Sequence, residues 1–454
     1  MFYSSINHHI NPTNNNIAIY DSELNAFSYA QLHQKITEIE TVFKQNNLTK
    51  SSLVILHFDK SFEGLAHLLC CIKMEIIYIP VDANTPENRL EKIKKSSNAN
   101  AIVSNQFSIQ HLNKEKQNLP NNACCVLYTS GSTGNPKGVI ISQKSLASFT
   151  EWCSTEFNIT STDTLTNYAP FHFDLSTFDI FSGLCNGAKI WLINNTLAGN
   201  FRLLGEQLKK IKPSVWYATP TVYKLLMQYG NLNADYQPRL SLFAGEIFDV
   251  KSLNQLRKTW NNTTFYNLYG PTETNVCTFY KLPSSDEPLT QMQPIGISCP
   301  YAKTKLSDKN ELLIAGESLM LGYLNEPNLT AEKFTTINDE KWLKSGDIVE
   351  IIDNLMYYRS RNDRMIKKNG FRIELAEIEN EMLNHPNIKQ VACIFNQQKI
   401  TVLYIGNKTS NIALKTFCKQ QLLAYMIPDS FIFLNELPVN SNGKIDYAQL
   451  IQYL

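Results

Sequence analysis

Short apolar runs alternate with stretches of helical periodicity over the first two thirds of the chain. Residues 51–58, 76–80 and 101–105 are almost uninterrupted runs of hydrophobic side chains, which is typical of strands buried on both faces. Residues 62–74 and 86–96 separate these runs and read as helices. Repetition of this kind predicts an α/β layer with parallel strands. Three later runs continue the pattern: 188–193, 214–218 and 240–245.

The pattern changes after about residue 300. Residues 303–324 alternate between apolar and polar side chains and turn often, which predicts antiparallel hairpins. A further hairpin is expected over 346–367, with Asp353 and Asn354 at its turn. Beyond Asp363 the order β–α–β–α–β predicts a separate α+β domain of about 90 residues. We therefore expect two domains, residues 1–362 and 363–454.

Composition and charge exclude several classes of protein. The chain has 454 residues, of which 43% are hydrophobic and 18% charged, and its net charge is +1. A near-neutral balance gives no electrostatic basis for binding nucleic acid. The sequence contains neither a signal peptide nor an apolar run of about 18 residues, so we expect no membrane association and a cytoplasmic location. Ten scattered cysteines, without metal-ligand spacing, are expected to be reduced thiols.

The strongest local signal is LYTSGSTGNPKGV, residues 127–139. A strand end leads into glycines, hydroxyl side chains and a lysine, and exposed N–H groups in such a loop can cradle phosphates. It is not a Walker A loop, because that motif requires Gly-Lys followed by Ser or Thr. The string resembles the phosphate loop of AMP-forming adenylating enzymes, the ANL superfamily.

Five other motifs of that superfamily occur in family order and at plausible spacing. They cover the acyl-substrate pocket, the adenine and metal site, the ribose-binding Asp, the hinge and the C-terminal catalytic lysine. One departure is Ser360, where the family usually has Gly. The five strings are FHFDLSTFDIF (171–181), FYNLYGPTETNVC (265–277), KSGDIVE (344–350), SRNDRMIKKNGFRIELAEIE (360–379) and NSNGKIDY (440–447).

The resemblance implies a fold and two half-reactions. The large N-terminal domain should contain parallel and mixed sheets sandwiched by helices, with a small β-barrel-like subdomain, and the small α+β C-terminal domain should be mobile about a hinge at Asp363. ATP and Mg²⁺ are the implied cofactors. Lys444 would bridge the substrate carboxylate and the α-phosphate, as a catalytic residue together with Thr272 and Glu273.

The resemblance also assigns the nucleotide-binding residues. Glu273 would bind Mg²⁺, a hard cation that favours carboxylate oxygen. Asp347 would accept hydrogen bonds from the ribose hydroxyls with Arg361 nearby. Asn267 and Tyr269 would contact adenine. The residues implied for the phosphates are Thr129, Ser130, Thr133 and Lys137.

Asp174 indicates which class of carboxylic acid is activated. A buried carboxylate is costly unless paired, and the α-ammonium of an amino acid would pair with it, whereas a fatty acid would not. The implied pocket is otherwise apolar, which favours a small or medium apolar amino acid. His172 is given no catalytic role, and Asp179 is interpreted as structural. The implied pocket residues are Asp174, Leu175, Phe178, Tyr217, Leu242, Ala244, Leu268, Val276 and Cys277.

This lining resembles that of stand-alone ligases that load L-proline onto a carrier protein. D-alanine–carrier protein ligases are the alternative, although they typically have Cys at the position of Ala244. An acyl-CoA ligase is a more distant alternative, opposed by Asp174. A catalytically dead binding protein is opposed by the retained motif residues. Because the chain ends ten residues after Lys444, we expect the accepting thiol to belong to a separate carrier protein or to coenzyme A. A carrier protein with a phosphopantetheine thiol is favoured, because it accompanies amino-acid activation in the enzymes that this chain resembles.

Overall fold

The computed structural model describes residues 2–105, 108–113, 119–131, 135–283, 288–438 and 445–454. The chain forms two compact units. The second unit contains the whole segment from Asp363 to the C-terminus, and two short N-terminal segments join it. The first unit combines Met1–Ala83, Ser97–Leu127 and Gly138–Asn362, and the second combines Asn84–Ser96, Tyr128–Lys137 and Asp363–Leu454.

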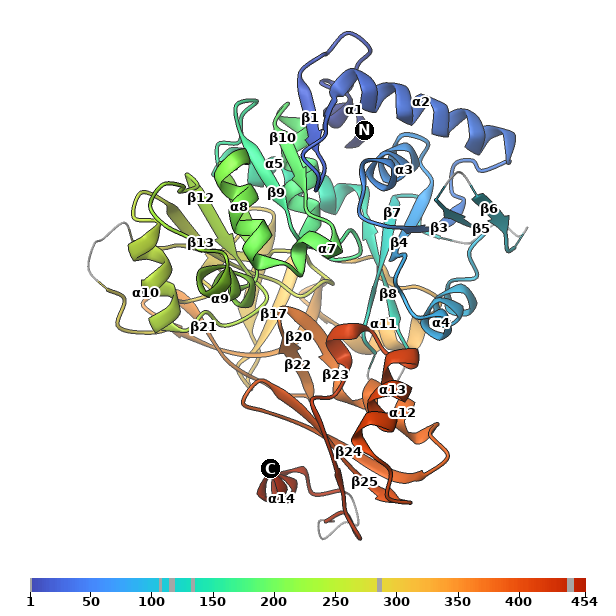
Figure 1. The fold of residues 1–454 in the computed structure, drawn as a ribbon, viewed down its shortest axis with the longest axis vertical. Helices are drawn as coiled ribbons and strands as arrows, with labels where there is room; N and C mark the ends of the chain where they lie inside the picture. Colours follow the sequence, from blue (N-terminus) through green and yellow to red (C-terminus); the bar gives the residue numbers. More distant parts are fainter. Residues whose placement is uncertain (1, 106–107, 114–118, 132–134, 284–287, 439–444) are drawn as a thin grey trace. The chain divides into compact units, whose positions relative to one another are not determined.

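A nine-stranded mixed sheet runs through the first unit (Figure 1). Its six central strands are parallel, as the apolar runs predict, and its edges are antiparallel. The order is β15 (Ile297–Ser298), β14 (Thr278–Lys281), β13 (Thr264–Tyr269), β12 (Leu240–Phe243), β11 (Val215–Ala218), β9 (Thr164–Asn167), β10 (Lys189–Leu192), β1 (Ile17–Tyr20) and β2 (Ala26–Ser28).

A seven-stranded sheet contains the first three predicted strands, again in parallel. Gly322–Tyr323 belongs to this sheet as an antiparallel edge strand, although the sequence pattern places it in a run of local hairpins. The reason is a pairing with residues 139 and 140, far away in the chain. The order is β18 (Gly322–Tyr323), β8 (Lys137–Ser142), β7 (Ala123–Thr129), β4 (Ile77–Asp82), β3 (Leu53–Phe58), β5 (Ala101–Ser104) and β6 (Ser108–His111).

Helices pack against both faces of the nine-stranded sheet. On one face, Trp216 and Phe243 form a cluster with α8, α9 and α10, which Figure 1 shows beside β12 and β13. On the other face, Tyr217 and Leu242 share a cluster with α2, α3, α5 and the seven-stranded sheet. The helices are α1 (Phe2–Asn7), α2 (Tyr29–Gln45), α3 (Phe62–Lys73), α5 (Gln143–Glu156), η1 (Phe178–Ser182), α6 (Gly183–Cys185), α7 (Asn195–Ala198), α8 (Phe201–Ile211), α9 (Pro220–Tyr229), α10 (Val250–Thr259) and α11 (Pro327–Lys333).

A five-stranded antiparallel sheet completes the first unit, where the resemblance implies a small β-barrel-like subdomain. Its longest hairpin turns at Asp353 and Asn354, both at positive φ, as the sequence predicts. The strands are β16 (Ala302–Leu306), β17 (Glu311–Gly316), β19 (Phe334–Ile337), β20 (Glu340–Ile352) and β21 (Leu355–Arg361).

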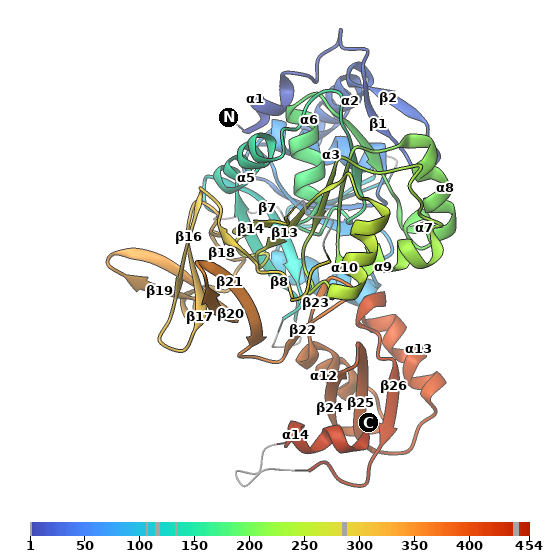
Figure 2. The same cartoon turned by 90° about the vertical axis from the view of Figure 1, so that its left-hand side faces the viewer.

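The second unit has its own hydrophobic core between helices and a three-stranded sheet. Figure 2 shows α12 and α13 beside β24, β25 and β26. An ion pair between Arg89 and Glu377, both side chains buried, joins α4 to α12. The elements are α4 (Glu87–Ser97), β22 (Met365–Lys368), β23 (Phe371–Glu374), α12 (Leu375–Leu383), β24 (Ile388–Asn396), β25 (Lys399–Gly406), α13 (Asn411–Gln421), η2 (Ala424–Met426), β26 (Ser430–Phe433), α14 (Tyr447–Leu450) and η3 (Ile451–Tyr453).

Candidate functional site

The carboxylate assigned to ribose is held by two neighbours. Asp347 lies in β20 directly after Gly346, whose φ of +81° is a conformation that favours glycine. Arg361 is its register partner in β21 and donates to Asp347 Oδ1 at 2.7 Å. The Tyr269 hydroxyl donates to Oδ2. Because Asp347 is 1% exposed, these partners fix its orientation.

Asn267 and Tyr269 lie two residues apart in β13, so they share one face of the strand. The Asn267 amide donates to Pro294 O at 2.7 Å. Burial, followed by the charge of Asp347, raises the pKa of Tyr269 well above its usual value, so this hydroxyl remains a donor. In the structure Tyr269 therefore contacts Asp347, the residue assigned to the ribose hydroxyls, whereas the resemblance assigns Tyr269 itself to adenine.

Glu273 is fully buried beside a tyrosine that the sequence does not single out. The Tyr323 hydroxyl donates to Glu273 Oε1 at 2.6 Å, and the Met320 N–H donates to Glu273 O at 2.7 Å. Thr272 precedes it and is half-buried. In the described part of the chain, no three or more His, Cys, Asp or Glu side chains gather as metal ligands. One carboxylate fits Mg²⁺, which binds one or two carboxylates and takes its other ligands from phosphates and water.

The residues assigned to the amino-acid pocket come together in one cluster. Tyr217 of β11 and Leu242 of β12 are register partners and so lie on the same face of the sheet. The Phe178 and Tyr217 rings meet edge to face, 5.5 Å apart. Phe178 begins the π-helical turn η1, a conformation found frequently at functional sites. Leu175 packs against the extended core of the first unit, which also contains the buried pocket residues Phe178, Tyr217, Leu242, Ala244, Leu268, Val276 and Cys277.

Asp174 is half-buried, and its charge contributes, after burial, to raising the pKa of Tyr217. It lies on a segment ordered by hydroxyl side chains. Ser176 Oγ donates to Phe173 O at 2.7 Å, and Thr177 Oγ1 donates to Asp174 O at 2.6 Å. The amide of Asn275 donates to Thr177 Oγ1 at 2.9 Å. Asn275 follows Glu273 by two residues, so this bond joins the assigned metal carboxylate to the amino-acid pocket.

The phosphate loop is described up to Gly131 and again from Asn135, so Thr133 lies outside the described residues. A Cβ added at Gly131 would stand 1.9 Å from Asn135 O, which is why this turn requires glycine. Thr129 Oγ1 is buried without a hydrogen-bond partner in the described structure, so this hydroxyl could bind a ligand oxygen.

Carboxylates of the second unit accept from the groups assigned to phosphate. The Gly131 N–H donates to Glu377 Oε2 at 3.1 Å, and Lys137 Nζ lies 3.7 Å from Glu374 Oε1. Ser130 Oγ donates to Arg372 O at 2.9 Å. The Gly131 N–H and Lys137 therefore face carboxylate oxygens, and Ser130 faces a carbonyl oxygen, which fits a site that binds phosphate oxygens.

The resemblance assigns two residues of the second unit, Lys444 and Asp363, to catalysis and to the hinge. Lys444 lies outside the described residues. Asp363 is the first residue after the first unit ends at Asn362, and its Oδ1 accepts the Met365 N–H at 3.2 Å. The chain therefore crosses from one unit to the other at the position assigned to the hinge.

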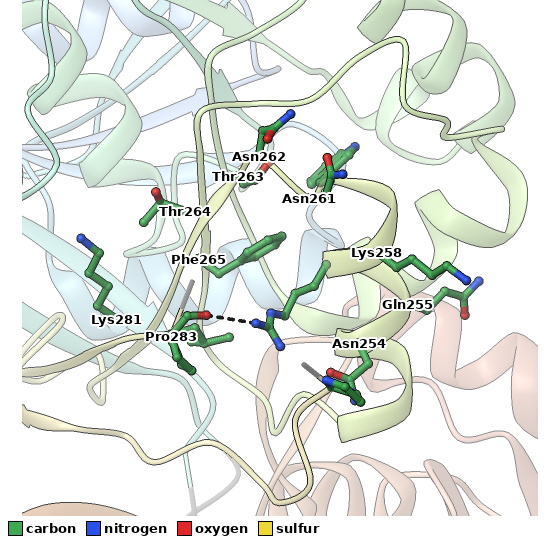
Figure 3. Close-up of a pocket in the computed structure, with 14 residues that line it drawn as sticks. Asn254, Gln255, Lys258, Asn261, Asn262, Thr263, Thr264, Phe265, Lys281 and Pro283 are labelled. Carbon is green, nitrogen blue, oxygen red and sulfur yellow. Dashed lines mark hydrogen bonds between the residues drawn. The ribbon is translucent and has the colours of Figure 1, made fainter. Parts of the chain in front are cut away.

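A large groove lies elsewhere, between α10 and the end of β14 (Figure 3). Arg257 donates to Pro283 O at 3.0 Å across it, and Lys258 and Lys281 also line it. It contains no residue assigned to the site, and residues 284–287 beside it lie outside the described part of the chain.

All ten cysteines are free thiols, nine of them buried and Cys185 half-buried. Burial raises the pKa of Cys70, Cys125 and Cys185 to about 12. At neutral pH these groups are un-ionised and behave as small apolar side chains.

A family model described as AMP-binding enzyme matches residues 6–119 and 104–324, and one described as AMP-binding enzyme C-terminal domain matches residues 377–444. The chain belongs to the AMP-binding enzyme family. This confirms the resemblance found in the motifs. Members of the family use ATP. In the described part of this AMP-binding enzyme, no helix is both long and apolar enough to cross a membrane.

Two named relatives of this AMP-binding enzyme cover nearly all of it. It is 31% identical to an L-proline–[L-prolyl-carrier protein] ligase of Pseudomonas fluorescens, over 93% of each chain. It is 30% identical to a D-alanine–D-alanyl carrier protein ligase of Listeria monocytogenes, again over 93% of each chain. An adenylation domain of Vibrio cholerae, solved with glycyl-adenosine-5'-phosphate, has the same fold, with a TM-score of 0.83 at 20% identity over 100% of this chain and 96% of that one.

Proposed function

We propose that this AMP-binding enzyme activates an amino acid with ATP and transfers it to the phosphopantetheine thiol of a separate carrier protein. L-Proline is the preferred substrate in this proposal. The proposal rests on one half-buried carboxylate, Asp174, whose charge acts on Tyr217, a member of the buried apolar cluster. The ammonium group of an amino acid requires a counter-charge once it is desolvated, and the methylene groups of a proline ring pack favourably against apolar side chains. The L-prolyl-carrier relatives support this substrate.

In the first half-reaction, a carboxylate oxygen of the amino acid attacks the α-phosphorus of ATP, and the bond to pyrophosphate breaks. Asp174 would hold the ammonium group, and Asp347, oriented by Arg361, would hold the ribose hydroxyls. Glu273 would hold Mg²⁺, which supplies positive charge for the phosphate oxygens. Positioning and electrostatic stabilisation dominate chemistry of this kind. Lys444 would neutralise charge on the carboxylate and α-phosphate.

In the second half-reaction, the carrier thiol attacks the carbonyl carbon of the aminoacyl-AMP. AMP leaves and the thiol loses its proton, so a thioester forms. The hinge position Asp363 would let Lys444 leave the site between the two steps.

The second candidate substrate is D-alanine, supported by the carrier-ligase relatives at 30% identity. Both substrates carry an α-ammonium, so Asp174 serves either. They differ in the apolar volume that the pocket must fill, and a missing methylene changes specificity by only about 1–3 kcal/mol.

The test is amino-acid-dependent exchange of pyrophosphate into ATP, with the twenty L-amino acids, D-alanine and a fatty acid at equal concentration. L-Proline should give the fastest exchange, and alanine a weaker signal. D-alanine ranking first would replace the substrate and keep the reaction. Exchange with the fatty acid alone would contradict amino-acid activation.

A further inference from the structure

A buried lysine holds the start of the segment that carries Asp174. Lys60 lies between β3 and α3 and is 6% exposed. Its Nζ donates to Asn167 O at 2.5 Å and to Ala169 O at 2.8 Å. Asn167 ends β9, and Ala169 follows two residues later. A single ammonium group thus fixes two main-chain carbonyls where the chain leaves the sheet.

The end of the same segment is tied to this point by a carboxylate. Asp179 lies in η1, is 1% exposed, and accepts the Asn167 amide at Oδ2, 3.2 Å away. Burial lowers the pKa of Lys60 to about 7, and the charges of Asp179 and Asp82 oppose that shift. Burial also raises the pKa of Asp179 well above its usual value, against the charge of Lys60. The two groups are therefore electrostatically coupled.

Close packing leaves this segment little room to relax. A Cβ added at Gly64, in the first turn of α3, would stand 2.9 Å from Asp59 O and 3.4 Å from the Phe171 ring. A cavity of about 20 Å³ between Lys60, Phe171 and His172 has room for a single water. Without the ammonium group, Ala169 O would lose the Lys60 donor and Asn167 O would keep only the Ile193 N–H, 3.1 Å away, so this point of the segment would be held less firmly.

We propose that Lys60 is a positioning residue for the amino-acid substrate: it holds the carbonyls of Asn167 and Ala169 and thereby places the Asp174 carboxylate. The inference rests on the proposed function, because it assigns to Asp174 the substrate ammonium. In the described structure the hydrogen bonds of Lys60 go to these two carbonyls, whereas the residues assigned to ATP lie on β13, β20 and β21 and in the phosphate loop. Lys60 should therefore affect amino-acid binding and leave ATP binding intact.

The test compares Lys60→Met and Lys60→Arg with the unchanged chain, measuring KM for L-proline and KM for ATP separately by pyrophosphate exchange. Lys60→Met should raise the amino-acid KM about tenfold or more, with the ATP KM changed by less than about twofold. Lys60→Arg keeps charge and donors and should restore most of the affinity for the amino acid. Lys73→Met is the matched control, because Lys73 ends helix α3, which follows Lys60, and forms a partly exposed ion pair with Glu40.

An unchanged amino-acid KM in Lys60→Met, or an equal rise in both KM values, overturns the inference. If Lys60→Met does not fold, Lys60→Gln replaces it. The Gln amide carries no charge and is shorter than the Lys side chain, so it should also raise the amino-acid KM selectively. An absent selective rise there also overturns the inference. If the unchanged chain shows no exchange with any amino acid, the proposed function itself fails and the inference fails with it.

Discussion

Under the proposed function, Asp174 is the residue that distinguishes an amino acid from other carboxylic acids. Asp174→Ala would leave the substrate ammonium buried without a counter-charge. Removing one partner of a buried ion pair costs about 3–5 kcal/mol, so kcat/KM for L-proline should fall roughly a hundred- to a few-thousand-fold. Pyrophosphate exchange measures this loss.

The matched control for that change is Asp235→Ala, at an exposed aspartate of the first unit, which should exchange normally. A loss for Asp174→Ala that is no larger than for the control would contradict the assigned role.

Single residues also show where sequence reasoning stops. Asp347 and Arg361 both lie in motifs that can be recognised in the sequence. Their contact follows from the pairing of β20 with β21. Tyr323 and Lys60 stand in no motif of the sequence analysis. Their partners are 50 and 107 residues away, so only the folded chain brings each pair together.

At the scale of an element, helix α3 contains a histidine that makes stability depend on pH. His67 is 0% exposed, 4.4 Å from the Phe58 ring and 5.9 Å from the Phe43 ring. Its Nδ1 lies 2.9 Å from Glu63 O. Burial lowers its pKa from 6.5 to about 4, although the Glu63 carbonyl opposes that shift. The folded state therefore holds this ring neutral.

Protonation of His67 makes the free energy of unfolding depend on pH. Between pH 6.5 and about 4, the unfolded chain binds the proton and the folded chain does not, so stability falls as pH falls. The full loss is about 3 kcal/mol. Melting temperature between pH 7 and 5 should drop less steeply in His67→Leu than in the unchanged chain. Exposed His111→Gln is the control and should keep the original slope, and equal slopes in all three proteins would contradict this prediction.

Elements with strong local signals are predictable, and elements made by distant pairing are not. The Asp353-Asn354 turn is decided by two residues that tolerate positive φ, and the hairpin forms where expected. The two-residue strand β18 has no such signal, because it exists through pairing with β8. The turn η1 is equally hidden, since a π-helix has no periodicity that five residues can display.

At the scale of the whole molecule, the chain passes from the first unit to the second at Asp363, and under the proposed function this position is the hinge between the two half-reactions. Asp363→Pro fixes φ and removes an N–H, so it should slow thioester transfer more than adenylation. Pyrophosphate exchange measures adenylation, and loading of a holo carrier protein from supplied aminoacyl-AMP measures transfer.

Lys444→Ala is the complementary variant and should show the opposite split, losing exchange by several orders of magnitude while still transferring. Equal losses in both assays for Asp363→Pro would indicate general damage to the fold and would contradict a hinge role.

The burial of the thiols has a consequence for a protein that makes reactive acyl groups. A thiolate at the surface would attack an acyl adenylate and trap the amino acid on the enzyme. All ten cysteines are buried or half-buried, and burial keeps nine of them protonated by raising the pKa. Under the proposed function, the thiols of the enzyme therefore do not compete for the aminoacyl-AMP, and the acyl group is transferred to the thiol of a separate carrier protein.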